Sequence, residues 1–273
     1  MSLHKCGFLF AVGAALACAQ PTSSLQASDG AALNNRGVEL RSAGHPDEAM
    51  LQFNAAIRIA ESCGDDRLLA TALTGLGSSL ADQGEYVRAE PVLRRSLALF
   101  EKTTGPDSLE TGEAANNLAM VYRKDGDLAQ AESQLDRALP LMRAHLDPHS
   151  LELEIAFNNM FIVLAEQKRW DQAEPYVLHA LQIAQARPED ANRADVEENL
   201  ALLQAHRGQF HEAAQTMQFA IGIEDRTLSP DDPRLARSLA SYAAYLRKIR
   251  QKSDAERAEQ RARLIRHAAV AQP

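Results

Sequence analysis

Hydrophobic and polar positions along this chain follow a helical spacing that is interrupted and restarted at regular intervals. In one unit, Leu118 and Tyr122 fall on one face of a helix, and Asp125-Gly126 then breaks that helix. A second apolar stripe follows with 3–4 spacing, at Leu128, Ala131, Leu135, Ala138 and Leu139. The pattern predicts two amphipathic helices joined by a tight turn.

The turn recurs with a nearly constant period. Its equivalent positions are Gly44, Gly84, Gly126, Lys168, Gly208 and Arg250, separated by 40, 42, 42, 40 and 42 residues. Such a period is typical of a solenoid of helical hairpins, in which each repeat buries its apolar face against its neighbours. We therefore expect one elongated all-α domain of six helix-turn-helix repeats over residues 29–268. Its last repeat, where Glu259 and Arg263 interrupt the stripe, is expected to be a degenerate cap.

Small residues occupy two further positions in the second helix of each repeat. The first set is Ala49, Ala89, Ala131, Ala173, Ala213 and Ala255, and the second is Ala56, Ser96, Ala138, Ala180, Ala220 and Ala262. Where the two helices of a hairpin cross, a larger side chain would push them apart. The two sets therefore predict close helix crossings in every repeat.

The junctions between repeats complete a family resemblance. Gly105-Pro106-Asp107, Leu146-Asp147-Pro148-His149 and Ser229-Pro230-Asp231 are similar to the Gly-Pro-Asp-His-Pro junction of the tetratricopeptide repeat (TPR) in its longer variety, known from kinesin light chains and many bacterial proteins. The resemblance covers residues 29–267. It departs at Lys168 and Arg250, where the family has glycine. It implies a right-handed superhelical solenoid that acts by binding proteins.

The N-terminus has the pattern of an export signal. Lys5 precedes an apolar run over residues 6–19, which is too short to span a bilayer and ends in small residues. Ala17-Cys18-Ala19 fits an ordinary signal-peptidase site, whereas Ala15-Leu16-Ala17-Cys18 resembles a bacterial lipobox with Cys18 as the lipidated residue. We expect a signal peptide over residues 1–19, a flexible tether over residues 20–28 and a location in the periplasm or on a membrane of a bacterial envelope. Residues 269–273 are expected to form a disordered tail.

The charge of the chain argues against nucleic acid as a partner. The net charge is −8, and no basic stripe runs along the repeats. Residues 247–266 hold eight Lys or Arg and three Asp or Glu, so the basic end carries +5 and the remainder −13. The pattern favours a polar terminal helix that keeps the solenoid end soluble, with an anion or membrane contact as the alternative. Membrane attachment is otherwise expected only through the N-terminal lipid.

An asparagine ladder is the sharpest candidate for a binding site. Nine residues before each turn lie Asn35, Gly75, Asn117, Asn159, Asn199 and Ser241. Asn is a poor residue for a helix interior, so its repetition indicates a role for the amide. The TPR resemblance implies that these amides lie on the concave face and hold the backbone of an extended peptide. An amide can both donate and accept a hydrogen bond, as a peptide unit does. Bridging between neighbouring helices is the alternative.

Basic side chains occur one helical turn after the ladder positions, along the first helix of several repeats. Arg123 and Lys124, with Arg41, Arg247 and Lys248 in other repeats, would favour an acidic or C-terminal carboxylate partner if they face the groove. As solvated helix ends they would instead complement the helix dipole.

No catalytic, cofactor or metal site is expected. His145 and His149 are four residues apart, but Pro148 prevents a continuous helical turn between them. Trp170 occupies the position of Tyr86 and Phe210 in other repeats, so it is expected in the core. The sequence thus predicts a non-enzymatic module that binds a protein or peptide in a groove formed by Asn35, Asn117, Asn159, Asn199, Arg123 and Lys124. The alternative is an envelope scaffold that acts by self-association or through its convex face.

Overall fold

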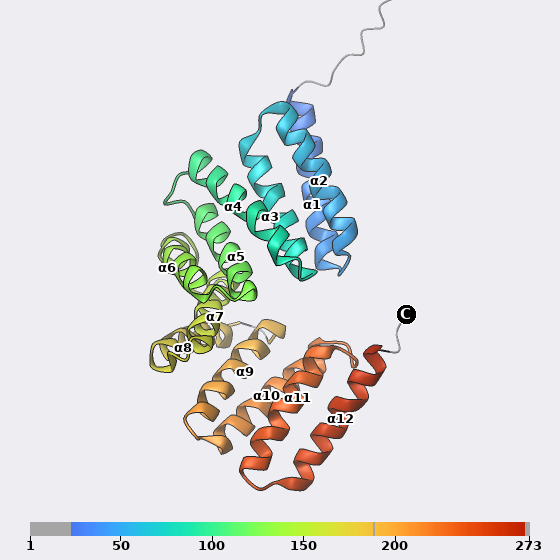
Figure 1. Ribbon diagram of the computed structural model, residues 1–273, viewed down its shortest axis with the longest axis vertical. Coiled ribbons are helices and arrows are strands. Elements are labelled where there is room, and N and C mark those ends of the chain that lie inside the picture. Colours follow the sequence, from blue (N-terminus) through green and yellow to red (C-terminus); the bar gives the residue numbers. More distant parts are fainter. Residues whose placement is uncertain (1–22, 188, 271–273) are drawn as a thin grey trace, which may run out of the picture.

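The computed structural model describes residues 23–187 and 189–270, and within these ranges it is built of helices without strands. The helices are α1 (Ser23–Ser42), α2 (Pro46–Cys63), α3 (Asp66–Asp82), α4 (Tyr86–Thr103), α5 (Leu109–Asp125), α6 (Leu128–His145), α7 (Leu151–Glu166), α8 (Trp170–Gln185), α9 (Ala191–His206), α10 (Phe210–Thr227), α11 (Pro233–Lys248) and α12 (Lys252–Val270). They form successive hairpins along an open arc (Figure 1). The predicted all-α solenoid is confirmed.

Each hairpin turns at one residue with left-handed backbone geometry. The φ angle lies between 77° and 89° at Gly44, Gly84, Gly126 and Gly208, and it is 64° at Lys168 and 66° at Arg250. A backbone bond of the same kind closes these turns, such as the one from Asp127 N–H to the Tyr122 carbonyl at 2.9 Å. Lys168 and Arg250, which replace glycine, therefore form the same turn. Their side chains make this left-handed conformation energetically less favourable than it is for glycine.

The twelve small positions predicted at the helix crossings are all buried. Each has a relative exposure of 0%, Ser96 included. The Ser96 hydroxyl donates a hydrogen bond to the Ala70 carbonyl at 2.8 Å. The one polar side-chain atom at these positions is therefore hydrogen-bonded, and it does not push the helices apart. Small side chains at these positions let the two helices of a hairpin approach closely, as expected.

The arc follows from which helices meet between repeats. Each second helix packs against the first helix of the next repeat, as α2 does on α3 and α4 on α5. The first helices also contact one another, in the pairs α1–α3, α3–α5, α5–α7 and α7–α9. The first helices therefore form the inner layer of the arc, and the second helices form the outer layer.

The ends of the domain differ slightly from those expected. Helix α1 begins at Ser23, so residues 23–28 are helical where a tether was expected. These residues contain no Pro or Gly, and Leu, Gln and Ala among them favour helix, which extends the packed helix backwards. Helix α12 likewise continues to Val270. The signal segment of residues 1–19, Cys18 included, and residues 20–22 of the tether lie outside the described residues.

Arginines near the basic C-terminal end of the chain form ion pairs with carboxylates. Arg247 forms two bonds of 2.8 Å to Glu259, and Arg261 reaches Asp225 of the preceding repeat at 3.0 Å. On the other face of α12, Ala255 and Ala262 are fully buried. The end of the solenoid is thus covered by a helix whose outer face is polar. Within the described ranges no helix combines the length and apolar character that crossing a bilayer requires.

We predict that Lys168→Gly stabilises the protein. Glycine removes the steric strain of the left-handed turn, which stabilises the folded state. It also raises the conformational entropy of the unfolded chain, which is a smaller and opposite effect. The net gain in the free energy of unfolding should be about 1 kcal/mol. Urea unfolding measures the difference, and Arg250→Gly should behave alike. As a control, Gly126→Ala should lower stability, since φ is 89° there. A destabilised Lys168→Gly protein would contradict the assignment.

Candidate functional site

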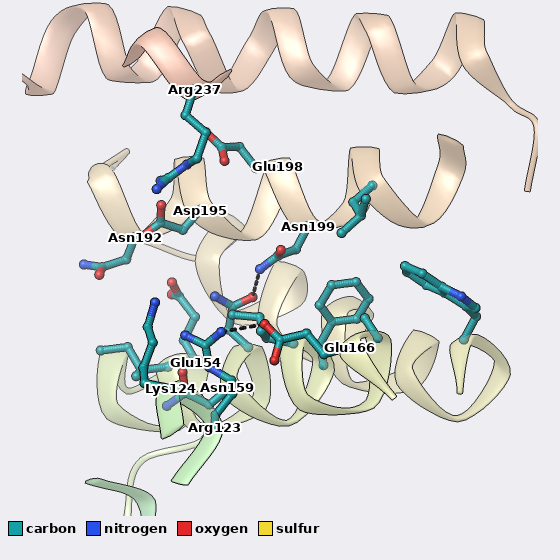
Figure 2. A pocket seen from close by; sticks show the side chains of 17 residues that line it. Arg123, Lys124, Glu154, Asn159, Glu166, Asn192, Asp195, Glu198, Asn199 and Arg237 are labelled. Carbon is teal, nitrogen blue, oxygen red and sulfur yellow. Dashed lines mark hydrogen bonds and ion pairs between the residues drawn. The ribbon is translucent and has the colours of Figure 1, made fainter. Parts of the chain in front are cut away.

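The concave surface contains two hollows, both lined mainly by first helices. The first hollow, of about 370 Å³, lies over α1, α3 and α5 and includes Asn34, Val38, Arg67, Gly75, Glu110 and Asn117. The second hollow, of about 590 Å³, lies over α5, α7, α9 and α11 and includes Lys124, Glu154, Asn159, Asp195, Asn199 and Arg237 (Figure 2). Together we call them the groove.

Two asparagine pairs cross between neighbouring repeats along the groove. Asn159 donates from Nδ2 to Asn116 Oδ1 at 3.0 Å, which joins α7 to α5. Asn199 donates in the same way to Asn158 Oδ1 at 2.8 Å, which joins α9 to α7 (Figure 2). In each pair, the donor lies nine residues before its turn and the acceptor lies ten residues before the previous turn. We call each pair a rung.

The four asparagines predicted from the sequence therefore have different surroundings. Asn117 lines the first hollow, and Asn159 and Asn199 line the second. Asn35 is exposed and lines neither hollow, while the adjacent Asn34 lies in the wall of the first. Asn159 and Asn199 bridge neighbouring helices, as the alternative interpretation of the ladder expected, and they also line a hollow.

The two predicted cations lie at one end of the second hollow. Arg123 is mostly buried and pairs with Glu166 at 2.7 Å (Figure 2). Lys124 is exposed, and its pKa is lowered chiefly by the positive charge of Arg123, then by desolvation and by Arg237. Arg237 extends from α11 on the opposite side of the hollow. Positive charge therefore borders the second hollow on two sides.

Carboxyl groups lie between these cations. Glu154 is 1% exposed and pairs with Arg187 at 2.5 Å, yet burial raises its pKa to about 7. Burial, followed by the charge of Glu198, raises the pKa of Asp195 to about 6. These two groups lose and gain protons near neutral pH, so the charge of the second hollow varies with pH.

Glu224 of α10 is a further carboxyl with a raised pKa, and Ser238 links it to Glu198 in the wall of the second hollow. Ser238 Oγ contacts Glu224 Oε1 at 3.0 Å and also Glu198 Oε1. Because a serine has one hydroxyl proton, it cannot satisfy two ionised carboxylates at once. Burial first, and then the charge of Glu198, raise the pKa of Glu224 to about 7.

Trp170 differs in part from its expected role. Its ring packs on the hydrophobic core, but it also lines the second hollow. It stacks on His206 with ring centroids 4.2 Å apart and the planes 16° from parallel. The side chain is therefore a partly exposed core residue that also forms part of the wall of the second hollow.

Comparison with known proteins decides the family. A family model described as tetratricopeptide repeat matches residues 68–144 and 152–223, together more than half of the chain. The chain belongs to the tetratricopeptide repeat family. No curated protein matches the sequence.

Solved structures share this TPR fold at low sequence identity. BtubC (BKLC) from P. vanneervenii is 18% identical with a TM-score of 0.64, covering 93% of this chain and 94% of that one. Pseudomonas aeruginosa pilF is 18% identical with a TM-score of 0.61, covering 85% and 90%. PilW, a type IV pilus biogenesis factor, is 17% identical with a TM-score of 0.61, covering 89% and 92%. At these identities the similarity establishes the fold alone.

Sequence reasoning missed several residues that line this TPR groove, and one, Asn116, that bonds to a groove residue without lining either hollow. Asn116 and Asn158, the rung acceptors, directly precede ladder residues, so adjacent asparagines occur at 34–35, 116–117 and 158–159. That repeated pair was the available signal. Glu154, Asp195 and Arg237 have no such signature, because their position in the groove depends on how the repeats stack.

The described part of the TPR domain contains no group of three or more His, Cys, Asp or Glu side chains that could hold a metal ion. His145 ends α6, where its Nδ1 lies 2.8 Å from the Leu141 carbonyl. The groove offers amides, cations and carboxyls, which suit non-covalent binding.

We predict that Asn116→Ala lowers the free energy of unfolding by about 1–2 kcal/mol, because the buried Asn159 Nδ2 loses its acceptor. In a double-mutant cycle with Asn159→Ala, urea unfolding should give a coupling energy of about 1 kcal/mol. Asn117→Ala is the control: its amide forms no rung, so its effect should stay within about 0.5 kcal/mol. A coupling near zero would contradict the rung.

We predict that stability decreases as pH rises through neutrality. Glu224 and Glu154 bind a proton more tightly in the folded state, where their pKa is about 7, than in the unfolded state, where it is 4.5. Their stabilising contribution is complete below the unfolded pKa and is lost as pH rises through the folded pKa. Urea unfolding between about pH 5 and pH 8 measures this loss.

Glu224→Gln isolates one of these carboxyls. The amide resembles the protonated acid, so at about pH 8 the variant should be about 2 kcal/mol more stable than the wild type and less dependent on pH. Glu212→Gln, at an exposed position in the same helix, should leave the pH dependence unchanged. Parallel curves for wild type and Glu224→Gln would show that Glu224 does not titrate there.

Proposed function

We propose that this TPR protein is a non-enzymatic interaction module that binds an extended polypeptide segment in its groove. The observation that carries the proposal is the pair of polar hollows along the inner layer, with amides at repeated positions. Extended peptides bind through their main-chain amides, and side-chain pockets then select the sequence. The groove supplies both kinds of contact, because its asparagines match peptide units and its charged side chains can select.

The charges of the second hollow define the partner further. Lys124 and Arg237 can each hold a carboxylate, whereas the carboxyls of Asp195 and Glu198 between them can hold a basic or amide group. A segment with alternating or mixed charge therefore complements this surface better than a wholly acidic one. Trp170 and Leu202 add apolar surface at the same hollow.

The test compares capture of partners by charge-reversed proteins. Lys124→Glu combined with Arg237→Glu should reduce capture from an envelope extract about tenfold or more, since like charges at an interface are strongly unfavourable. Quantitative mass spectrometry of bound proteins measures the change. Arg58→Glu, an exposed charge on α2 in the outer layer, should bind as the wild type does. Equal capture by all three proteins would remove the second hollow from consideration.

A second function, assembly through the outer face, has one observation in its favour. Leu51 and Val87 are 67% and 78% exposed and border an outer hollow of about 660 Å³ between α2 and α4. Exposed apolar side chains that lie together mark contact surfaces. In this case light scattering should show a mass that rises with concentration, and Leu51→Ser with Val87→Ser should abolish the rise while leaving groove binding intact.

We further propose that the protein is exported and held at a bacterial membrane by a lipid on Cys18. The support is the basic residue, short apolar run and lipobox-like residues of the N-terminus. Cells labelled with radioactive palmitate should yield a labelled protein, and Cys18→Ser should abolish labelling and release the protein from the membrane fraction. An unlabelled wild-type protein whose N-terminus is Gln20 would instead indicate cleavage as a soluble exported protein.

A further inference from the structure

Two apolar side chains on the outer layer stand at positions where the repeat does not require them. Leu51 lies seven residues after the turn of its repeat, and Val87 lies three residues after its own turn. At the first position the other repeats have Pro91, Ser133, Pro175, Gln215 and Arg257. At the second they have Asp47, Ala129, Asp171, His211 and Ser253. Formation of the hairpin therefore does not explain why these two side chains are apolar.

The outer hollow between α2 and α4, which Leu51 and Val87 border, is apolar as a whole. Leu76 and Leu80 of α3 and Val92 of α4 line it as well. Charged side chains line the corresponding hollows of other repeats, with Glu90, Glu101 and Asp127 between α4 and α6, and Asp225, Asp254 and Arg257 between α10 and α12. A contiguous exposed apolar surface of this kind marks a contact with another molecule.

Opposite charges lie at one end of the outer hollow. Asp47 is in the first turn of α2 and Arg88 is in the first turn of α4, and both are exposed and line the hollow. Asp47 accepts a bond from Gln83 at Oδ1, and Arg88 pairs with Glu85 through Nη1. A carboxylate has a second oxygen and a guanidinium has further N–H groups, so each side chain can also bind a partner.

This surface is complementary to itself. As second helices of successive hairpins, α2 and α4 run in the same direction. A two-fold axis parallel to them places α2 of one copy against α4 of another. Asp47 then faces Arg88 of the second copy, and Leu51 faces Val87 of the second copy. Each contact occurs twice, because a two-fold interface repeats every contact with the copies exchanged.

We propose that the outer hollow joins two copies of this chain in a closed, two-fold symmetric dimer. Leu51 and Val87 form its apolar centre, and Asp47 pairs with Arg88 of the other copy at its edge, which is the usual arrangement of a protein interface. The inference rests on the second proposed function, assembly through the outer face, and specifies its partner and its symmetry.

Two consequences distinguish this dimer from other assemblies. Both copies use the same surface, so association stops at two chains and does not continue into a filament. The groove lies on the inner layer, so the dimer presents two open grooves. A partner with two copies of the recognised segment should therefore bind the dimer more tightly than it binds a monomer.

Charge-exchange variants of the full-length protein test the pairing. Asp47→Arg alone brings like charges together at both contacts, and so does Arg88→Asp alone. Each variant by itself should therefore raise the dissociation constant of the dimer about a hundredfold or more. Sedimentation equilibrium measures the mass from which this constant is obtained.

An equimolar mixture of the two variants should dimerise as the wild type does. In the mixed dimer the introduced arginine meets the introduced aspartate at one contact, and the original Asp47 and Arg88 meet at the other. Recovery of the dimer also shows that both variants are folded. A single chain that carries both substitutions should likewise form a dimer with itself.

Asp171→Arg is a matched control, because Asp171 has the same position relative to its turn as Asp47 and is also exposed, but belongs to the fourth repeat. Its dimer should have the dissociation constant of the wild type. Every variant has the same N-terminus, so a difference between variants reports the outer hollow and not the apolar run of residues 6–19.

The possible contrary results have separate meanings. A wild type that stays monomeric up to about 100 μM would overturn both the dimer and assembly through the outer face, and would leave a different protein as the occupant of the hollow. A wild type that associates would still contradict the two-fold pairing if either variant dimerises alone, if their mixture stays monomeric, or if the mass exceeds that of a dimer. In those cases assembly through the outer face stands only if Leu51→Ser with Val87→Ser abolishes association.

Discussion

The close approach of the two helices in each hairpin is the constraint on which the rest of this structure depends. It requires a side chain no larger than that of Ala or Ser at two positions of every second helix, and all twelve such positions are fully buried. Because the hairpin is held at this spacing, the next first helix can pack in the cleft between its helices. Repetition of one local geometry then generates the arc from contacts between neighbouring repeats.

The arc places corresponding residues of successive first helices next to one another. Positions nine and ten residues before the turn therefore meet across repeats, which allows Asn159 and Asn199 to donate to the previous repeat. The same geometry makes exceptions visible. At Gly75 no amide can take the donor position, because Phe53 fills the space, and the buried Oδ1 of Asn34 has no donor among the described groups. Core packing thus decides which repeats an amide bond can join.

Desolvated carboxyls give the fourth and fifth repeats a distinct electrostatic character. Glu154, Asp195 and Glu224 are desolvated carboxyls with pKa values raised to about 6 or 7. Their burial lowers stability at neutral pH, and such groups cluster at functional sites more often than elsewhere. Arg237 and Lys124 lie beside the first two of them, so the second hollow carries both signs of charge within one surface.

The sequence by itself determined the repeat, the turn positions and the buried small residues. Each of these is local, because a left-handed turn and an alanine at a helix crossing are requirements within one hairpin. It also indicated that Lys168 and Arg250 stand at turn positions, since the period remains in register across them. Where local requirements are weak, prediction was less accurate, as at residues 23–28, which extend α1 although their polar sequence indicated a tether.

Only the tertiary structure decided what the polar residues do. Rung partners lie 43 and 41 residues apart, and whether Asn159 meets Asn116 or solvent depends on the rotation between successive repeats. The same rotation brings Glu154 of α7, Asp195 of α9 and Arg237 of α11 to one hollow. The period of the sequence shows that repeats stack, but the rotation arises from the packing of many side chains at each interface. For that reason Glu154, Asp195 and Arg237 could not be placed in the groove from the sequence, whereas the ladder asparagines repeat with the period and could be.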